Sequence, residues 1–451
     1  MKKVYDEQIA FFKTHATKSY DFRMEQLSIL REALMNNEKL FQEALFKDLH
    51  KSSFELYSTE LGFVMSSIRK TMTNLKRWMK VKKVKTPIYQ MFTKSYIQSE
   101  PLGTVLIIGP YNYPFQLVIE PLIGALAAGN TVMIKPSEFA SNTEKALAKV
   151  LNEAFDSRVV HVVKGGIETT QALLKLRFDH IFFTGSTRVG QIVYEAAAKH
   201  LTPVTLELGG KSPTIVDETA NIDVAAKRIV FGKYINAGQT CIAPDYIYVH
   251  HSIKDQLIET IKHTIDNFYN DQENQYGRII NEKHFQRLSG LIDEEKCVYG
   301  GKKESKDLYI EPTILDRVNW NDKVMKEEIF GPILPILTYE NIDEVIETIQ
   351  SKEKPLALYL FTEDKPTIEK VFSKLSFGGG AINDTIMHVA NPYLPFGGVG
   401  QSGIGAYHGK TSFKTFSHQK AYVKKSTKID PKIAYPPYTE KQEKLIRKIL
   451  K

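Results

Sequence analysis

The stretch from Leu206 to Cys241 decides how the rest of the sequence is interpreted. It opens with LELGGKSP at 206–213 and closes with FGKYINAGQTC at 231–241. Glu207 ends an extended apolar segment and precedes two glycines, a pattern typical of a carboxylate at a strand end. Cys241 follows a helical pattern and a glycine-containing loop. A thiol and a carboxylate, each on a turn, suit covalent acyl transfer, so we predict Cys241 as the nucleophile and Glu207 as the general base.

The length and composition indicate a globular protein with more than one domain. The chain has 451 residues, of which 42% are hydrophobic and 25% are charged, which allows a large core. Two cysteines, Cys241 and Cys297, cannot form a disulfide framework. We therefore expect a reducing compartment and predict a cytoplasmic location. Asp6 and Glu7 follow the basic start where a secretion signal would be apolar, so we predict no signal peptide.

The positive charge allows several classes of partner. A net charge of +8 and a pI of about 9.0 suit nucleic acid, a membrane surface or an anionic cofactor. The lysines are spread along the whole chain, however, and no nucleic-acid motif accompanies them. We therefore predict a solvated basic surface and no nucleic-acid partner.

The first half of the chain predicts a doubly wound parallel sheet. Residues up to about Lys83 read as helical, because apolar residues recur at helical spacing and Gly and Pro are nearly absent. The segment 84–101 leaves this pattern, and Thr93–Ser99 alternates as a strand. From Thr104 strands and helices then alternate, which implies a parallel sheet that binds ligands beyond the carboxyl ends of its strands. The predicted strands are Val105–Ile108, Thr131–Ile134, Val159–Val163, Asp179–Phe183 and Pro203–Leu206.

A second alternating pattern runs from Gly210 to about Phe416 and predicts a second α/β domain. Its predicted strands include Tyr246–Val249, Ile333–Thr338 and Ala357–Phe361. We interpret the glycine-rich segments 377–380 and 396–400 as turns. Predicted helices cover Asp223–Asn236, Ile253–Phe268, Ile342–Gln350 and Lys365–Leu375, and a final strand covers Gln419–Val423.

Two motifs of the first domain suit a dinucleotide. The segment FTGSTRVG at 183–190 joins a strand to a helix, where backbone N–H groups can approach a phosphate. Its spacing departs from G-x-G-x-x-G, so a simple strand–helix turn remains an equal alternative for the motif alone. Lys135 and Glu138 follow the second strand, where an acidic residue typically holds ribose hydroxyls. A solvated loop starting a helix is the alternative there.

Asn112, in GPYNYPF at 109–115, has two interpretations. Its amide can donate to an oxyanion in the cleft. It can also cap the helix that Pro114 begins, and the local sequence favours the cap.

No C-x-x-C or H-E-x-x-H spacing is present, so we predict no metal site. Cys297 lies among charged residues, and we interpret it as incidental.

Taken together, the motifs resemble the aldehyde dehydrogenase superfamily over nearly the full length. The short N-terminus, GAYHG at 405–409 and YPPY at 435–438 are most similar to the class 3, fatty-aldehyde-type branch. The matching segments, in order, are 109–115, 135–138, 183–190, 206–213, 238–241, 327–332 and 395–403.

The resemblance implies NAD(P)-dependent oxidation of an aldehyde, medium- or long-chain or otherwise hydrophobic, to the acid through a cysteine thiohemiacetal and thioester. Cys241 matches the nucleophile, Glu207 the base, and Asn112 the oxyanion-holding residue. NAD is the expected cofactor, with NADP also accepted. The positions that match cofactor contacts are Lys135, Glu138, Thr184, Gly185, Ser186, Gly190, Glu328 and Phe330.

The resemblance also implies a Rossmann-like cofactor domain, a catalytic domain and a strand-pairing oligomerisation element, assembled as a homodimer. We place the NAD-binding domain at 1–83 and 103–208, the catalytic domain at 209–410 and the oligomerisation element at 84–102 and 411–430. Residues 431–451 form a predicted amphipathic tail. We expect its helix to pack on its own protein near the substrate entrance, and peripheral membrane contact is the alternative.

Two other functions are compatible with parts of the sequence. A thiol acyltransferase or hydrolase that uses no nicotinamide would explain Cys241 and Glu207. It would leave Glu138, Gly185 and Glu328 without a role. A basic, non-catalytic binding protein is the second alternative, and salt-sensitive binding to nucleic acid or anionic lipid without turnover would indicate it.

Overall fold

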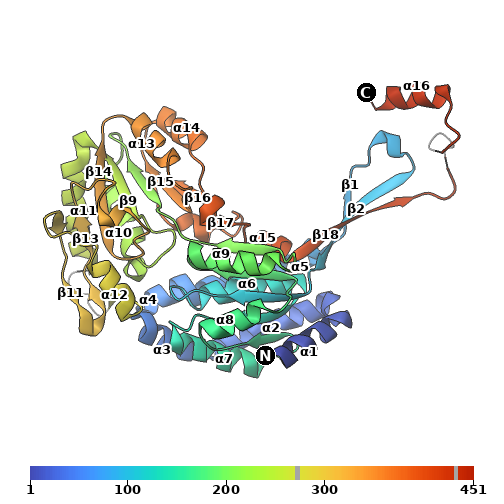
Figure 1. Cartoon of the computed structure of the whole chain (residues 1–451), viewed down its shortest axis with the longest axis horizontal. Helices are drawn as coiled ribbons and strands as arrows, with labels where there is room; N and C mark the ends of the chain where they lie inside the picture. Colours follow the sequence, from blue (N-terminus) through green and yellow to red (C-terminus); the bar gives the residue numbers. More distant parts are fainter. Residues whose placement is uncertain (270–274, 431–434, 451) are drawn as a thin grey trace.

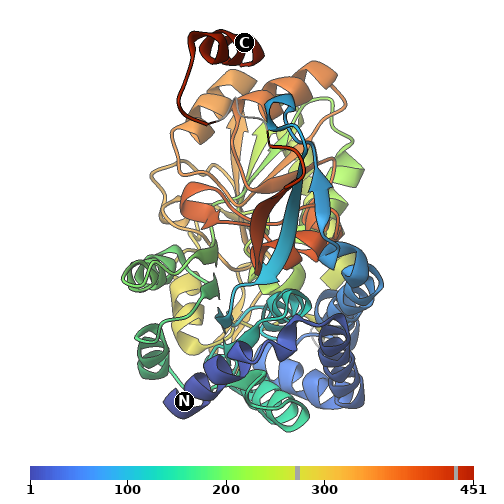
Figure 2. The same cartoon turned by 90° about the vertical axis from the view of Figure 1, so that its right-hand side faces the viewer.

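The computed structural model describes residues 1–269, 275–430 and 435–450. These residues form two large helix-covered sheets and an arm of three strands that projects from the body (Figure 1). In Figure 2 the arm points towards the viewer and crosses in front of both sheets. Within these ranges, no helix combines the length and the apolar character that a membrane crossing requires.

The first sheet has the strand order β17-β7-β6-β3-β4-β5. Its strands from β5 to β7 are parallel, and β17 pairs antiparallel with β7. The five predicted strands are present, each within one residue of its expected bounds. The two-residue β17 was not predicted, because so short a segment carries no alternation. The bounds are β3 (Thr104–Ile108), β4 (Thr131–Lys135), β5 (Val160–Val162), β6 (His180–Thr184), β7 (Val204–Glu207) and β17 (Gly403–Ile404).

Helices cover both faces of this sheet because successive side chains of a buried parallel strand point to opposite faces. Leu106 and Ile108 of β3 belong to one cluster with α1 (Lys2–Lys13), α8 (Ile167–Leu174) and α9 (Thr187–Ala198). Val105 and Ile107 belong to the cluster of the opposite face, formed by α6 (Gln116–Ala128) and α7 (Ser141–Ala154). An outer helical layer lies beyond α6 and α7 and consists of α2 (Tyr20–Asn36), α3 (Glu38–Leu49), α4 (Ser53–Leu56) and α5 (Gly62–Met79).

The second sheet has the order β10-β13-β14-β9-β8-β15-β16 and is parallel except for β10. The predicted turn at 377–380 is wrong, since Gly379 and Gly380 begin β16. A Cβ at Gly380 would lie 2.1 Å from the Leu358 carbonyl oxygen, so glycine permits close strand approach here. The strands are β8 (Pro213–Val216), β9 (Tyr246–His250), β10 (Cys297–Tyr299), β13 (Thr313–Leu315), β14 (Ile333–Tyr339), β15 (Ala357–Phe361) and β16 (Gly379–Ile382).

The four helices predicted for the second half are present as α10, α11, α13 and α14, whereas α12 and α15 were not predicted. The strands β8, β10 and β13 were not predicted, because each has only three or four residues. The pair β11 (Lys303–Glu304) and β12 (Tyr309–Ile310) forms a separate two-stranded ribbon. The helices are α10 (Ile222–Tyr234), α11 (Lys254–Tyr269), α12 (Glu282–Ser289), α13 (Ile342–Gln350), α14 (Lys365–Lys374) and α15 (Gly409–Thr415).

The arm consists of β1 (Lys82–Val84), β2 (Thr93–Pro101) and β18 (Ser417–Lys425) in antiparallel order. Strands β2 and β18 pair along their whole length, so the predicted strands near 93–99 and 419–423 are neighbours. Tyr96 stacks on Tyr422 with ring centroids 5.2 Å apart. The pairing fixes two segments that lie more than three hundred residues apart in sequence.

The C-terminal helix α16 (Glu440–Ile449) begins at a capping box, in which Thr439 accepts the backbone N–H of Gln442. None of its residues is buried, and it lies beyond the arm, away from both sheets (Figure 1). The prediction that this helix packs on its own chain is therefore wrong for the single chain. Residues 431–434 and 451 of the predicted tail lie outside the described residues.

Candidate active site

Glu207 is the last residue of β7 and is buried. Neither of its carboxylate oxygens has a hydrogen-bond partner. Burial raises the pKa of Glu207 well above its ordinary value. A buried carboxyl group without partners is costly and calls for a functional explanation. Here the group can take up and release a proton without first breaking a protein hydrogen bond.

The loop that carries Cys241 has an unusual backbone. After α10, three consecutive residues adopt positive φ: Asn236 at 54°, Ala237 at 51° and Gly238 at 74°. A Cβ at Gly238 would lie 2.3 Å from the carbonyl oxygen of Gly331, so only glycine fits there. Non-glycine residues in this region cost on the order of 1–3 kcal/mol each and persist where their surroundings hold them.

The side chain of Gln239 makes three hydrogen bonds that keep this loop in place. Its side-chain amide donates to the carbonyl oxygens of Asn236 at 3.1 Å and Arg278 at 2.9 Å. Its side-chain oxygen accepts the backbone N–H of Ile280 at 3.0 Å. Gln239 itself is buried. The three bonds fasten the strained loop two residues before Cys241.

Cys241 is a free, partly exposed cysteine. Burial of its sulfur, followed by the charges of Glu328 and Glu207, raises the pKa of the thiol to about 12. The backbone N–H groups of Cys241 and Ile242 act against this shift, because they favour a thiolate. The resting thiol is therefore protonated and needs a proton acceptor before it can attack.

The Asn112 side chain points to the cysteine loop and does not cap a helix. Its amide donates to the carbonyl oxygen of Gln239 at 2.9 Å. Helix α6 begins at Gln116, and the residue in the cap position, Phe115, makes no side-chain cap bond. The cap interpretation of Asn112 is therefore wrong, and its side-chain amide contacts the loop that precedes Cys241.

The turn between β6 and α9 holds four predicted cofactor positions. Ser186 occupies the cap position of α9, yet its side chain caps no N–H group. The backbone N–H of Gly185 donates to the Glu207 carbonyl oxygen at 3.0 Å. A Cβ at Gly190 would lie 2.6 Å from Leu208, so α9 packs closely on the segment after β7. The Thr184 hydroxyl is buried without a partner. A helix N-terminus without a side-chain cap and an unpartnered hydroxyl fit a pyrophosphate group.

Lys135 and Glu138 lie at the same edge of the sheet, after β4. The buried Lys135 ammonium group is 2.9 Å from a carboxylate oxygen of Glu138. The Glu138 side chain is about one third exposed, so it can still reach a ligand. The pair thus presents a carboxylate whose position is fixed by a buried cation.

Glu328 and Phe330 come from the other sheet, in the segment before β14. The Glu328 carboxylate lies against Gly209, where a Cβ would come within 2.0 Å of it. Burial, followed by the charge of Asp245, raises the pKa of Glu328 to about 8. Phe330 has a φ of 50°, and its ring meets Tyr111 edge to face at 5.9 Å. The structure therefore brings Glu328 beside the turn that follows Glu207, and Phe330 beside Tyr111.

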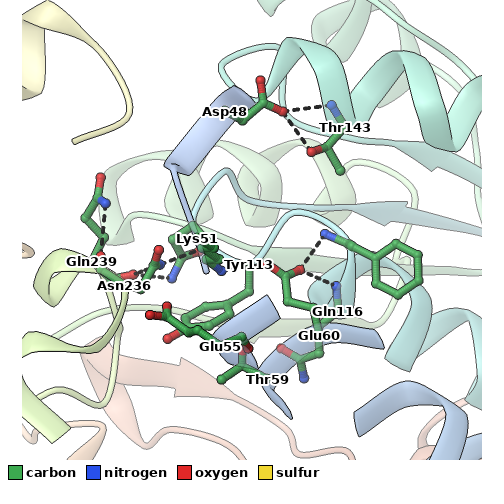
Figure 3. A network of polar contacts seen from close by, with 12 residues as sticks. Asp48, Lys51, Glu55, Thr59, Glu60, Tyr113, Gln116, Thr143, Asn236 and Gln239 are labelled. Carbon is green, nitrogen blue, oxygen red and sulfur yellow. Dashed lines mark hydrogen bonds and ion pairs between the residues drawn. The ribbon is translucent and has the colours of Figure 1, made fainter. Parts of the chain in front are cut away.

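Sequence analysis missed a buried polar network that includes Lys51, Glu60 and Tyr113 (Figure 3). Lys51 and Glu60 form a buried ion pair at 2.6 Å, and Lys51 also donates to the Asn112 carbonyl oxygen at 3.0 Å. The Tyr113 hydroxyl hydrogen-bonds the Thr240 hydroxyl at 2.8 Å. The available signal was a lysine and a glutamate nine residues apart in an amphipathic helical segment, which ordinarily indicates a solvated face.

A doubly wound sheet with a cysteine and a glutamate at its ligand-binding edge is compatible with the class of nicotinamide-dependent oxidoreductases. A sequence profile of the aldehyde dehydrogenase family matches residues 2–422. The chain belongs to this family. It is an NAD(P)-dependent enzyme that oxidises an aldehyde to the carboxylic acid.

Three relatives illustrate the similarity. The 4,4'-diaponeurosporen-aldehyde dehydrogenase of Staphylococcus aureus (strain NCTC 8325 / PS 47) is 55% identical over 445 residues, which cover 98% of this chain and 97% of that one. The aldehyde dehydrogenase family 3 member A2 of Pongo abelii is 49% identical, with 95% and 90% covered. The dimeric NADP-preferring aldehyde dehydrogenase of Rattus norvegicus is 47% identical, with 94% and 95% covered.

Two solved structures agree with these relatives. A substrate-bound Staphylococcus aureus AldH superposes with a TM-score of 0.98 at 53% identity, covering 100% of this chain and 99% of that one. A Mycobacterium tuberculosis aldehyde dehydrogenase complexed with NAD+ gives 0.80 at 29% identity, covering 88% and 84%. The α/β fold predicted from sequence and the family assignment are thus confirmed.

Proposed function

We propose that Cys241 is the nucleophile of the aldehyde oxidation, Glu207 its general base and Asn112 the side-chain donor to the oxyanion. One observation carries this assignment. The Asn112 amide is bonded to the backbone two residues before Cys241, at the edge where the unpartnered Glu207 carboxyl ends β7. A nucleophile, an oxyanion donor and a proton acceptor then share one cleft.

The chemistry follows from these three groups. The Cys241 thiol releases its proton to solvent, its sulfur bonds to the aldehyde carbon, and the carbonyl oxygen becomes an oxyanion that accepts bonds from the Asn112 amide and the Cys241 backbone N–H. Such a donor is typically worth about 10²–10³ in rate. When bound, the nicotinamide supplies the acceptor for the two electrons that leave with the substrate hydrogen. The resulting thioester on Cys241 is then cleaved by a water molecule whose proton Glu207 accepts, and the acid and the free thiol are released.

A thioester that accumulates on the enzyme can be detected by mass spectrometry. We propose to mix the enzyme and NAD rapidly with hexanal, quench in acid and measure intact mass. An adduct equal to the acyl group on the peptide that contains Cys241 supports the assignment. An adduct on Cys297, or a full first turnover with no thiol modification, would reject it.

On the cofactor side, we propose that residues 183–190 hold the pyrophosphate and that Glu138, fixed by Lys135, accepts bonds from the adenine ribose. Glu328 and Phe330 serve the nicotinamide ribose. A carboxylate at the ribose repels a 2′-phosphate, which favours NAD over NADP. The specificity constants kcat/KM for the two cofactors test this proposal, and a higher value with NADP would contradict it. Glu138→Gln should narrow the difference.

For the substrate, we propose a hydrophobic aldehyde of medium or long chain. Aromatic side chains support this class: the ring centroids of Phe63 and Phe396 lie 5.8 and 5.3 Å from that of His408. Tyr407, beside His408, interacts electrostatically with Glu207 and Cys241 and so lies at the same cleft. The Staphylococcus aureus relative is named for 4,4'-diaponeurosporen-aldehyde. Initial rates with acetaldehyde, hexanal, decanal, benzaldehyde and a polyene aldehyde test the proposal, and the highest kcat/KM with acetaldehyde would overturn it.

For the architecture, we propose that 1–83 and 103–208 act as the cofactor domain and 209–410 as the catalytic domain. The arm, within 84–102 and 411–430, joins two copies into a homodimer. Its support is the edge of β18, with Val423 60% and Tyr422 41% exposed. Light scattering that gives a monomer or tetramer mass at micromolar concentration would reject the dimer. A cytoplasmic location suits the free thiols.

For the tail, two contacts fit an exposed amphipathic helix. Leu445 and Leu450 are 45% and 62% exposed, and basic residues cover the opposite face. We propose that α16 packs against protein in the dimer near the substrate entrance, and that an anionic membrane is the rival surface. Removing residues 438–451 should raise KM for long-chain aldehydes more than for short ones. If truncation instead abolishes sedimentation with anionic vesicles and leaves the chain-length profile unchanged, the tail is a membrane contact.

A further inference from the structure

A buried charged pair lies beneath the proposed oxyanion site. Lys51 and Glu60 are each fully buried at the side chain, and their charged atoms are 2.6 Å apart. Lys51 follows the end of α3, and Glu60 lies in a π-helical segment, Tyr57–Leu61, between α4 and α5. Single π-helical turns occur frequently at functional sites. Replacing such a pair by apolar residues is often neutral or stabilising, so stability alone does not account for it.

The pair makes its remaining bonds to the segment that carries Asn112. Lys51 donates to the Asn112 carbonyl oxygen at 3.0 Å and lies 3.8 Å from the centre of the Tyr113 ring. The second oxygen of Glu60 accepts the backbone N–H groups of Phe115 and Gln116, both at 3.0 Å. Glu60 thus caps the N-terminus of α6, and Lys51 binds Asn112, three residues before Phe115.

The same carbonyl oxygen connects the pair to the cysteine loop. The Asn112 carbonyl also accepts the side-chain amide of Asn236 at 2.8 Å, and that amide also reaches the Gln239 carbonyl oxygen at 3.1 Å. Asn236 is the first of the three left-handed residues before Cys241. Figure 3 shows Lys51 close to Asn236 and Gln239. We call Lys51, Glu60, Asn112 and Asn236 the Lys51 network.

We propose that the Lys51–Glu60 pair is a positioning element for catalysis, which sets the Asn112 amide relative to Cys241. The proposal rests on the oxyanion role given above to Asn112. Lys51 and Asn236 both donate to the carbonyl oxygen of Asn112. This oxygen therefore links the residue that carries the oxyanion donor to the loop that carries Cys241. Displacement of a catalytic group by about 1 Å is enough to lower a rate about 10²-fold.

The test separates position from stability with a double variant. Lys51→Met with Glu60→Gln removes both charges and keeps a side-chain oxygen that can accept the Phe115 and Gln116 N–H groups. No buried charge is left without a partner, so we expect the thermal midpoint to stay close to that of the native enzyme. We expect kcat with hexanal to fall at least about tenfold, with KM for NAD within about twofold.

Arg23→Met is the matched control. Arg23 is a buried cation of the same helical layer, and it donates to the Ala127 carbonyl oxygen at the other end of α6. Its loss should lower the thermal midpoint and leave kcat unchanged. A double variant whose kcat stays within about twofold of the native value would overturn the proposal, since positioning would then not depend on the pair.

If the double variant does not accumulate as folded protein, Glu60→Asp decides. This variant keeps both charges and shortens the side chain by one methylene. Because the carboxylate then lies further from Lys51, it draws the lysine away from Asn112. A lower kcat at unchanged KM for NAD supports the proposal, and native kcat overturns it. Asn112→Ala distinguishes this failure from a failure of the proposed function. If Asn112→Ala retains native kcat, the oxyanion assignment itself is wrong.

Discussion

Glu60 and Glu207 are both buried glutamates near the proposed active site, but their hydrogen bonding is opposite. Glu60 has a cation and two backbone N–H groups as partners, whereas the carboxylate oxygens of Glu207 have none. Satisfied groups fix a backbone, because every bond must break before anything moves. An unsatisfied group is free to bind and release protons. Glu60 therefore belongs to the part of the site that is held rigid, and Glu207 to the part that reacts.

The largest expected effect comes from removing Cys241, the residue proposed to react with the aldehyde. Cys241→Ala should abolish aldehyde oxidation, with a loss of about 10⁴-fold or more, because the other thiol, Cys297, lies in β10 and away from Asn112 and Glu207 in the proposed mechanism. NAD binding should persist, since the cofactor contacts lie on other segments. Steady-state turnover and NAD titration measure the two quantities.

Cys297→Ala is the matched control for that experiment. Cys297 is the other partly exposed cysteine, and its thiol donates to the Tyr299 carbonyl oxygen at 3.3 Å, in β10 of the second sheet. Its removal should leave turnover unchanged. Native turnover in Cys241→Ala, or its loss in Cys297→Ala, would place the nucleophile elsewhere.

How far the sequence predicts this contrast depends on the range of the interactions. Glu207 and Cys241 were found because each lies in a short motif with a clear local pattern, a strand end and a loop after a helix. Lys51 was not found, because its partner Asn112 is sixty-one positions away in the chain. Helix α6 starts two residues later than Pro114 predicts, at the point where Glu60 caps it. Pairings across the chain leave no local signal for a pattern to detect.

Glu207→Gln should produce the second largest effect. An amide of the same shape cannot accept the proton of the attacking water, so turnover should fall by about 10²–10³-fold. Rapid mixing should then show a burst of reduced cofactor followed by slow hydrolysis, with acyl-enzyme visible by intact mass. A lost burst would show that Glu207 activates the thiol instead, and an unchanged steady-state rate would remove it from the mechanism.

The pH dependence of the rate gives a smaller effect with a definite sign. Burial, together with Glu328 and Glu207, raises the pKa of Cys241 to about 12. Below that pKa the thiolate fraction rises with pH, by up to about tenfold per unit. We therefore expect kcat/KM for hexanal, at saturating NAD, to increase from about pH 7 to about pH 9. A rate that falls over this range would show that the acidic form of a group in the cleft is the active one.

Glu120 lies between the two extremes and gives the smallest effect. In α6, one of its carboxylate oxygens accepts the Ser67 hydroxyl at 2.7 Å, and the other is buried without a partner. Burial raises its pKa from 4.5 to about 7, while the hydrogen bond from Ser67 lowers it in part. The unfolded chain thus loses this proton at lower pH than the folded chain, so stability falls as pH rises from 4.5 to about 7.

Glu120→Gln removes that loss, which amounts to about 3 kcal/mol once both forms are ionised. The variant should therefore melt a few degrees higher than the native protein at about pH 8 and at nearly the same temperature at about pH 4.5. Glu153→Gln, an exposed change on α7, is the control and should shift neither midpoint. Differential scanning calorimetry at the two pH values measures both variants. An equal gain for Glu120→Gln at both pH values would show better packing of the amide and no release of a buried charge, and Glu120 would then belong with the satisfied carboxylates such as Glu60.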